Sequence, residues 1–157
     1  MKKIFDKFRD GLAFVAALLF MLIFVLVILE ILCRTFLGFS ILWATDFIQL
    51  IVCWTLAFGM SAIVYSNDHL KIDFVKMKLS PKTQNILELL TDIFEFGFFV
   101  MLIPCGIKTA TTKMSILFTT LRWPMGYMYA ALPVFGALCA IFMISRMCDD
   151  VSRLKKG

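Results

Sequence analysis

The sequence predicts an all-α integral membrane protein with four transmembrane helices. Of its 157 residues, 61% are hydrophobic, and the mean hydropathy is +0.91. Four long stretches carry few charges, and most Lys and Arg residues lie at their ends or in the connections. A soluble domain of this length would leave much of that apolar surface in water. The bilayer is therefore the expected solvent.

The predicted spans are residues 12–34, 43–65, 86–108 and 123–146, in one membrane domain over residues 1–157. Each is long enough to supply the roughly 20 mostly apolar residues that a spanning helix needs. The third has the shortest uncharged core, residues 96–107, so it must include three acidic residues. Ser80 and Pro81 predict an N-cap followed by proline at the first helical position. We expect one long helix from there, with its first turns at or above the membrane surface.

The first span is expected to be an uncleaved helix. The N-terminus, MKKIFDKFRD, has the basic character of a signal peptide, but the apolar run after it is longer than that of a signal peptide. It is also not followed by a small-residue cleavage site of the AxA type. The segment is therefore expected to stay in the membrane.

Basic residues predict that both termini and the connection between the second and third spans are cytoplasmic. Twelve of the sixteen Lys and Arg residues fall on that side, and the other side has only Arg34, Lys108, Lys113 and Arg122. Short cytoplasmic segments carry such an excess of positive charge. Trp43 and Trp123 open the second and fourth spans at the opposite interface, as in an aromatic belt.

Acidic residues within the spans are the first candidates for function. Glu30 and Arg34 are four residues apart, acidic residue first, which favours an intrahelical pair or a bridge to a partner subunit. Glu88, Asp92 and Glu95 are spaced to share one helix face. We interpret this face as a local charge network or a partner contact, in preference to a cation pathway.

The connection between the second and third spans is predicted to be a short interfacial segment. It places His69 and Asp73 one helical turn apart, and these two side chains alone do not make a metal site. We assign them to fold integrity.

Catalytic, cofactor and metal sites are not expected. The five cysteines are scattered singly, and one histidine cannot supply a bis-histidine haem pair. Nucleotide-binding and hydrolase motifs are missing. Nucleic acid is excluded as a partner because the basic residues lie at helix ends and form no basic domain.

Small residues recur at four-residue spacing and predict close helix packing in lipid. They are Cys53, Ala57 and Ser61 in the second span, Gly106 and Ala110 in the third, and Gly136 and Ala140 in the fourth. Pro104 and Pro133 predict kinks in the third and fourth spans, which a bundle can tolerate.

Four spans without an internal repeat favour a subunit of a larger assembly over a self-sufficient carrier. One alternative is a small homo-oligomeric ion-coupled exporter that uses Glu30, although Glu30 lies near the end of its span. A non-transport assembly factor is a second alternative. A quinone or thiol enzyme is disfavoured by the single histidine and the missing CxxC pair.

The order of features resembles a known family. Arg34 ends the first span, Trp43-Ala44-Thr45-Asp46 follows, and the second span contains Trp54 and Gly59. Then come His69-Leu70-Lys71-Ile72-Asp73, Leu79-Ser80-Pro81, Trp123-Pro124, Tyr127 and Pro133. From about Phe5 to Arg146 this resembles the small, DctQ-type membrane subunit of tripartite ATP-independent periplasmic (TRAP) transporters. Two departures are Asp46, where the family more usually has glutamate, and the sparse basic charge at residues 66–68.

The resemblance implies a non-catalytic role in the bacterial inner membrane. Such a subunit pairs with a large membrane subunit that carries the substrate and sodium sites. A soluble periplasmic binding protein delivers an organic acid, such as a dicarboxylate or a sialic acid, and the sodium gradient drives uptake. The small subunit is then a lipid-embedded scaffold that helps to dock the binding protein.

Two sets of residues follow as hypotheses from this role. The docking set lies at the non-cytoplasmic end: Arg34, Trp43, Asp46, Arg122 and Trp123. The set for subunit contact or fold integrity is Glu30, Trp54, Gly59, His69, Asp73, Glu88, Asp92, Glu95 and Pro133.

Overall fold

The computed structural model describes the backbone of residues 2–66 and 81–154 and the side chains of residues 5–65 and 90–145. Its elements are α1 (Lys2–Leu32), the π-helical turn η1 (Cys33–Leu37), α2 (Leu42–Ser66), α4 (Pro81–Lys113), α5 (Gly126–Tyr129) and α6 (Ala131–Leu154). Four stretches are long and apolar enough to cross a membrane: Phe5–Leu37, Leu42–Tyr65, Leu90–Lys113 and Gly126–Ser145. The predicted all-α fold with four transmembrane helices is therefore confirmed. The predicted interfacial segment falls within residues 67–80, outside the described residues.

Helix α1 is longer than the predicted first span. It begins at Lys2 and not at residue 12, so the charged N-terminal residues continue the helix. At 1.5 Å per residue its 31 residues extend about 46 Å, against roughly 30 Å of bilayer hydrocarbon. The charged turns therefore lie beyond the apolar layer. At the other end, η1 widens the last turn and Gly38 ends it with a φ of 70°, a conformation that glycine adopts without steric cost.

Helix α4 is one continuous helix, as predicted from Ser80 and Pro81. It begins at Pro81, contains Pro104 and runs to Lys113. Proline suits the first position because the N–H group that it lacks would have no helical partner there. The helix continues past the predicted end of the span at residue 108.

The fourth span differs from the prediction because it begins with a short helix. Trp123 precedes the helix, and Gly126 starts α5, which ends at Tyr129 before α6 begins at Ala131. Pro133 lacks the N–H group that would donate to the carbonyl of Tyr129, four residues earlier. The next bond, from the Val134 N–H to the Ala130 carbonyl, is long at 3.4 Å. Proline therefore accounts for the interruption between α5 and α6.

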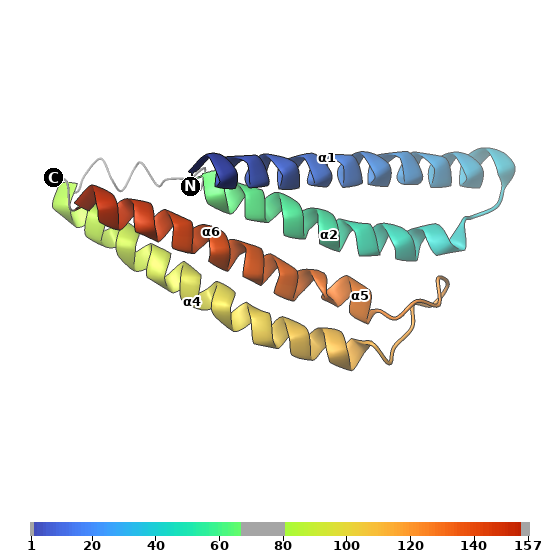
Figure 1. Cartoon of the computed structure of the whole chain (residues 1–157). Coiled ribbons are helices and arrows are strands. Elements are labelled where there is room, and N and C mark those ends of the chain that lie inside the picture. Colours follow the sequence, from blue (N-terminus) through green and yellow to red (C-terminus); the bar gives the residue numbers. More distant parts are fainter. Residues whose placement is uncertain (1, 67–80, 155–157) are drawn as a thin grey trace.

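The helices form an open layer and not a closed bundle. They follow one another in the order α1, α2, α6 and α4, so α1 and α4 form its two edges (Figure 1). Both termini lie at one end, here called the terminal end, and residues 33–41 and 114–125 lie at the opposite, loop end (Figure 1). The helices converge at the terminal end and fan out toward the loop end (Figure 1).

Glycines allow the closest helix contacts, as the small-residue spacing predicted. A Cβ atom on Gly106 of α4 would lie 2.7 Å from Cδ of Pro133 and 2.8 Å from its nitrogen. One on Gly136 of α6 would lie 3.1 Å from the carbonyl oxygen of Phe99. Gly59 of α2 faces Ala16 of α1, and a Cβ atom on Gly59 would lie 3.6 Å from the Cβ atom of Ala16. The contacts between α1 and α2 and between α4 and α6 thus each include a glycine.

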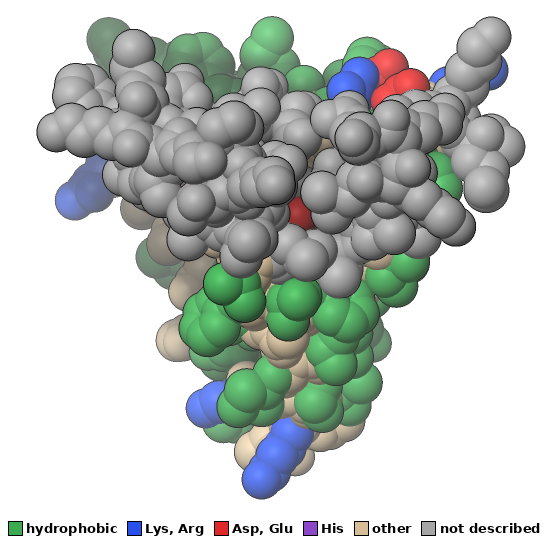
Figure 2. All heavy atoms as spheres, turned by 90° about the vertical axis from the view of Figure 1, so that its left-hand side faces the viewer, with side chains coloured by type: hydrophobic (Ala, Val, Ile, Leu, Met, Phe, Trp, Pro, Cys, Tyr) green, Lys and Arg blue, Asp and Glu red, His purple; other side chains and the backbone are tan. Residues whose placement is uncertain are grey.

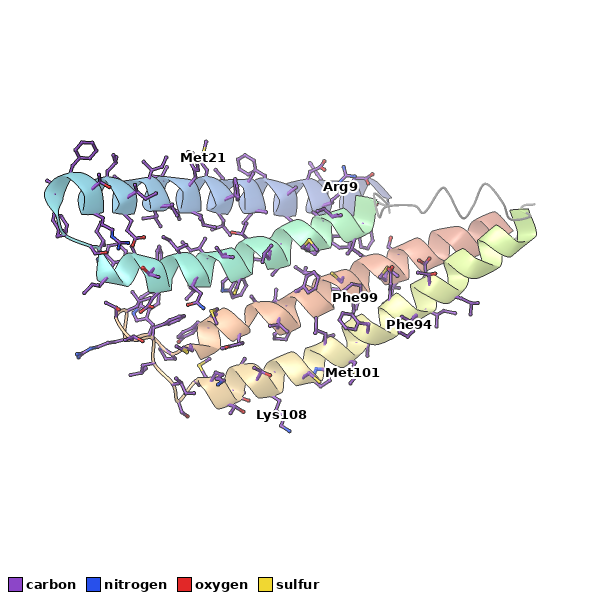
Figure 3. All side chains as sticks on the ribbon, turned by 180° about the vertical axis from the view of Figure 1, so that it is seen from behind. Arg9, Met21, Phe94, Phe99, Met101 and Lys108 are labelled. Carbon is purple, nitrogen blue, oxygen red and sulfur yellow. The ribbon has the colours of Figure 1, made fainter. Side chains whose placement is uncertain are left out.

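Burial is concentrated between α2, α4 and α6. The buried cluster consists of Val64, Phe99, Cys139, Ala140 and Met143. In the most apolar stretch of the α1 span only 6% of the residues are buried, against 39% in the corresponding stretch of the span at Gly126–Ser145. Phe99 lies between α4 and α6, whereas Met21 points away from α2 and Lys108 away from α6 (Figure 3). Seen from the terminal end, hydrophobic side chains form most of the described surface (Figure 2).

Candidate docking surface at the loop end

The link between α4 and α5 folds into a turn, here called the bridged turn (residues 116–125). The Phe118 N–H donates to the Trp123 carbonyl at 2.8 Å, and the Met125 N–H donates to the Ile116 carbonyl at 2.8 Å. These bonds flank a β-bridge between Leu117 and Pro124. The side chain of Phe118 is almost fully buried, at 2% exposed. The turn therefore has a defined conformation with an apolar anchor.

The tip of the bridged turn presents a cation and an aromatic ring. Arg122 has a φ of 54°, in the left-handed region that non-glycine residues rarely adopt. Its N–H donates to the Phe118 carbonyl at 3.3 Å. The side chains of Arg122 and Trp123 are both exposed. Two members of the predicted docking set are thus adjacent and accessible.

Asp46 is joined to this turn through its carboxylate. One oxygen, Oδ2, accepts hydrogen bonds from the backbone N–H groups of Thr120 at 2.8 Å and Leu121 at 3.0 Å. Asp46 comes from the beginning of α2, and its side chain is half-buried. The structure brings it together with Arg122 and Trp123, as the docking hypothesis requires, but its carboxylate faces the turn.

Trp54 makes a second link at the same end. Its Nε1–H donates to the carbonyl of Tyr127 in α5 at 3.2 Å. Its ring lies 5.5 Å from that of Phe58, centroid to centroid. Trp54 therefore joins α2 to α5.

The two remaining members of the docking set are exposed but belong to different elements. Trp43 lies at the start of α2, with its ring 6.2 Å from that of Phe47. Arg34 lies in η1, at the end of α1, and α2 and α6 lie between that edge of the layer and α4 (Figure 1). The bridged turn therefore gathers Asp46, Arg122 and Trp123, and it does not include Arg34.

The predicted pair between Glu30 and Arg34 is not formed. Among the described side chains an ion pair joins Arg9 to Asp10 at 2.7 Å, and none joins Glu30 to Arg34. Arg34 belongs to the π-helical turn. An ion pair with a solvent-exposed member gains little free energy and has to order two long side chains, so its absence costs the fold little. Glu30 is half-buried and Arg34 is exposed.

Two of the three predicted carboxylates of α4 point into the helix layer. Asp92 is 2% exposed and lies seven residues before Phe99, on the α6-facing side of α4. Glu95 is half-buried, and its Oε2 atom is buried without a hydrogen bond. Glu88 lies in α4, with a side chain outside those described, and His69 and Asp73 lie within residues 67–80. Among the described residues, His, Cys, Asp and Glu form no group of three that could hold a metal ion.

A cluster of aromatic rings at the terminal end was not predicted from the sequence. Phe5 and Phe8 of α1 contact Phe142 of α6, with ring centroids 6.4 Å and 5.8 Å away. Tyr65 of α2 lies 5.1 Å from Phe142 and donates its hydroxyl to Oδ1 of Asp6 at 3.0 Å. These residues are far apart in the sequence, and the only local signal was the aromatic character of the N-terminal segment.

Comparison with known proteins identifies the family. The family model described as "Tripartite ATP-independent periplasmic transporters, DctQ component" matches residues 23–153. No curated protein matches the chain. The family match begins within the last third of α1, covers all of α2, α4 and α5, and ends one residue before α6 does. The chain therefore belongs to the DctQ component family, the small membrane subunits of the tripartite ATP-independent periplasmic transporters.

Proposed function

We propose that this small subunit acts in the bacterial inner membrane as a scaffold for the large transport subunit of a sodium-driven uptake system. The transported compound is an organic acid, such as a dicarboxylate or a sialic acid. The loop end faces the periplasm and helps to dock the binding protein, and both termini are cytoplasmic. The chain itself carries out no catalysis.

The open layer of helices is the observation that carries the scaffold role. Helix α1 contacts α2 along its length and leaves large apolar side chains exposed, among them Phe14, Phe20 and Met21. On the opposite edge, Phe94 of α4 is 81% exposed. A chain of four helices that leaves both edges open has room for a large membrane partner as well as lipid.

The docking role is supported by the chemistry of the loop end. Arg122, Trp123 and Trp43 are exposed there. Arginine and tryptophan are enriched among the residues that dominate protein–protein binding energy. A turn with a defined conformation also loses little entropy when it binds.

Purification from the native membrane in mild detergent tests the subunit role. We expect a larger multi-span protein to accompany the chain in near-stoichiometric amount, identified by mass spectrometry. If the chain instead purifies alone as a discrete homo-oligomer, the scaffold role is wrong. The exporter alternative would then apply, and Glu30→Gln would be the first variant to test for transport in liposomes.

A further inference from the structure

The carboxylate of Asp46 forms hydrogen bonds within the chain. Oδ2 accepts from two successive backbone N–H groups, those of Thr120 and Leu121, at 2.8 Å and 3.0 Å. The donors lie 74 and 75 residues along the chain, in the bridged turn. A carboxylate that accepts from backbone N–H groups forms charge-assisted bonds, which are stronger than bonds between neutral groups. Asp46 thus fixes the turn from the start of α2.

The bridged turn needs such support at its tip. Arg122 adopts a φ of 54°, which costs conformational energy in a residue with a Cβ atom. The turn lies where the helices fan out (Figure 1), so fewer neighbouring helices can brace it. Thr120 and Leu121, the residues that Asp46 binds, directly precede Arg122.

We infer that Asp46 is a positioning residue for docking and does not itself contact the binding protein. This inference rests on the proposed docking function. Asp46 holds the bridged turn so that Arg122 and Trp123 project from its tip. A direct contact through Oδ2 would have to compete with its two bonds to the turn, and the side chain of Asp46 is half-buried.

The partner surface that fits this tip is acidic. The carboxylate of Asp46 is directed at backbone amides, and the exposed groups of the tip are the guanidinium of Arg122 and the ring of Trp123. Opposite charge steers such an encounter and fixes its register. Docking should therefore weaken as ionic strength rises.

Limited trypsin digestion tests the positioning role without any ligand. The probe is the Arg122–Trp123 bond, in the full chain purified with its large subunit. Cleavage of a folded segment follows the population of its open form. We expect Asp46→Ala to speed cleavage at this bond about tenfold or more, because both bonds to the turn are lost. Cleavage after Arg34, in η1, should be unchanged.

Three further variants control for general damage. Thr45→Ala changes the exposed neighbour of Asp46 on the same helical turn and should leave cleavage unchanged. Asp46→Asn keeps an acceptor oxygen without the charge and should give an intermediate rate. Asp46→Glu keeps the carboxylate and should restore most of the protection.

Retention of the binding protein by the immobilised two-subunit complex distinguishes the docking role of the bridged turn from the positioning role of Asp46. We expect Asp46→Ala to weaken retention in parallel with exposure of the turn. If Arg122→Ala abolishes retention but Asp46→Ala changes neither cleavage nor retention, the positioning role is wrong and the docking role stands. If Asp46→Ala exposes the turn but neither it nor Arg122→Ala affects retention, the docking role is wrong, and the inference that rests on it fails too.

Discussion

The terminal end and the loop end of the helix layer are held by different interactions. At the terminal end the helices converge. Four ring contacts join Phe5, Phe8, Tyr65 and Phe142 there, each with ring centroids no more than 6.4 Å apart. At the loop end the helices fan out, and hydrogen bonds from Asp46 and Trp54 reach the backbone of other segments. The terminal end thus depends mainly on ring packing, with one hydrogen bond from Tyr65 to Asp6, and the loop end mainly on directed bonds to backbone groups.

This difference has a functional meaning for a scaffold subunit. Packing of large rings fixes the relative positions of α1, α2 and α6 without specifying a surface for recognition. Bonds from side chains to the backbone fix the shape of a turn and leave its own side chains free to bind. The terminal end therefore suits a brace, and the loop end suits a docking surface.

The largest effect on the terminal end should come from Phe142→Ala. Phe142 is 1% exposed and contacts rings from both α1 and α2. Removing a buried ring costs about 3 kcal/mol or more in soluble proteins, and the packing part of that cost remains in a membrane. The stability of the purified chain in an SDS titration, followed by circular dichroism, measures it.

Ile144→Ala is the matched control, since Ile144 lies on the same helix and is 52% exposed. We expect its stability to stay close to that of the wild type. Equal losses in the two variants would show that the ring cluster does not hold the terminal end.

Gly106→Val should have the next largest effect. A Cβ atom there would overlap the backbone nitrogen of Pro133, which cannot move without displacing α6. Overpacking of this kind costs about 1–3 kcal/mol. Gly97→Val, on the same helix, has no atom within 4 Å of the new Cβ. A thermal-shift assay in detergent should separate the two variants, and similar melting temperatures would contradict the close contact.

Two conservative substitutions compare single hydrogen bonds at the two ends. Tyr65→Phe removes a donor to the carboxylate of Asp6, and Trp54→Phe removes a donor to the Tyr127 carbonyl. A bond to a charged acceptor is worth more than one between neutral groups, so we expect losses of about 1 and 0.5 kcal/mol. The SDS titration measures both. A greater loss for Trp54→Phe would reverse the order that bond chemistry predicts.

Local patterns in the sequence predicted much of the fold. Long apolar runs gave the four spans, Pro81 gave the start of α4, and glycine spacing gave the close contacts at Gly106 and Gly136. Each of these features depends on neighbours within one helix or on a short capping signal. Pro133 predicted a kink in the fourth span, and the helix is interrupted between α5 and α6 because the N–H group that Pro133 lacks affects the helix four residues earlier.

Three of the five residues in the docking hypothesis lie together in the structure, but the sequence did not predict their geometry. Asp46, Arg122 and Trp123 were assigned together by resemblance, and the structure brings them together. The direction of the Asp46 carboxylate depends on a turn more than 70 residues away, which spacing within one helix cannot indicate. The contacts of Phe142 with Phe5 and Phe8 were missed for the same reason.

Docking at the bridged turn can be measured as binding of the purified periplasmic partner to the immobilised two-subunit complex. We predict that replacing Arg122 and Trp123 together by alanine weakens binding about tenfold or more, as loss of interface anchors does. Lys108→Ala removes the same charge from the outward side of α4 and should leave binding unchanged (Figure 3). Unchanged binding in the double variant, or an equal loss with Lys108→Ala, would contradict docking at the bridged turn.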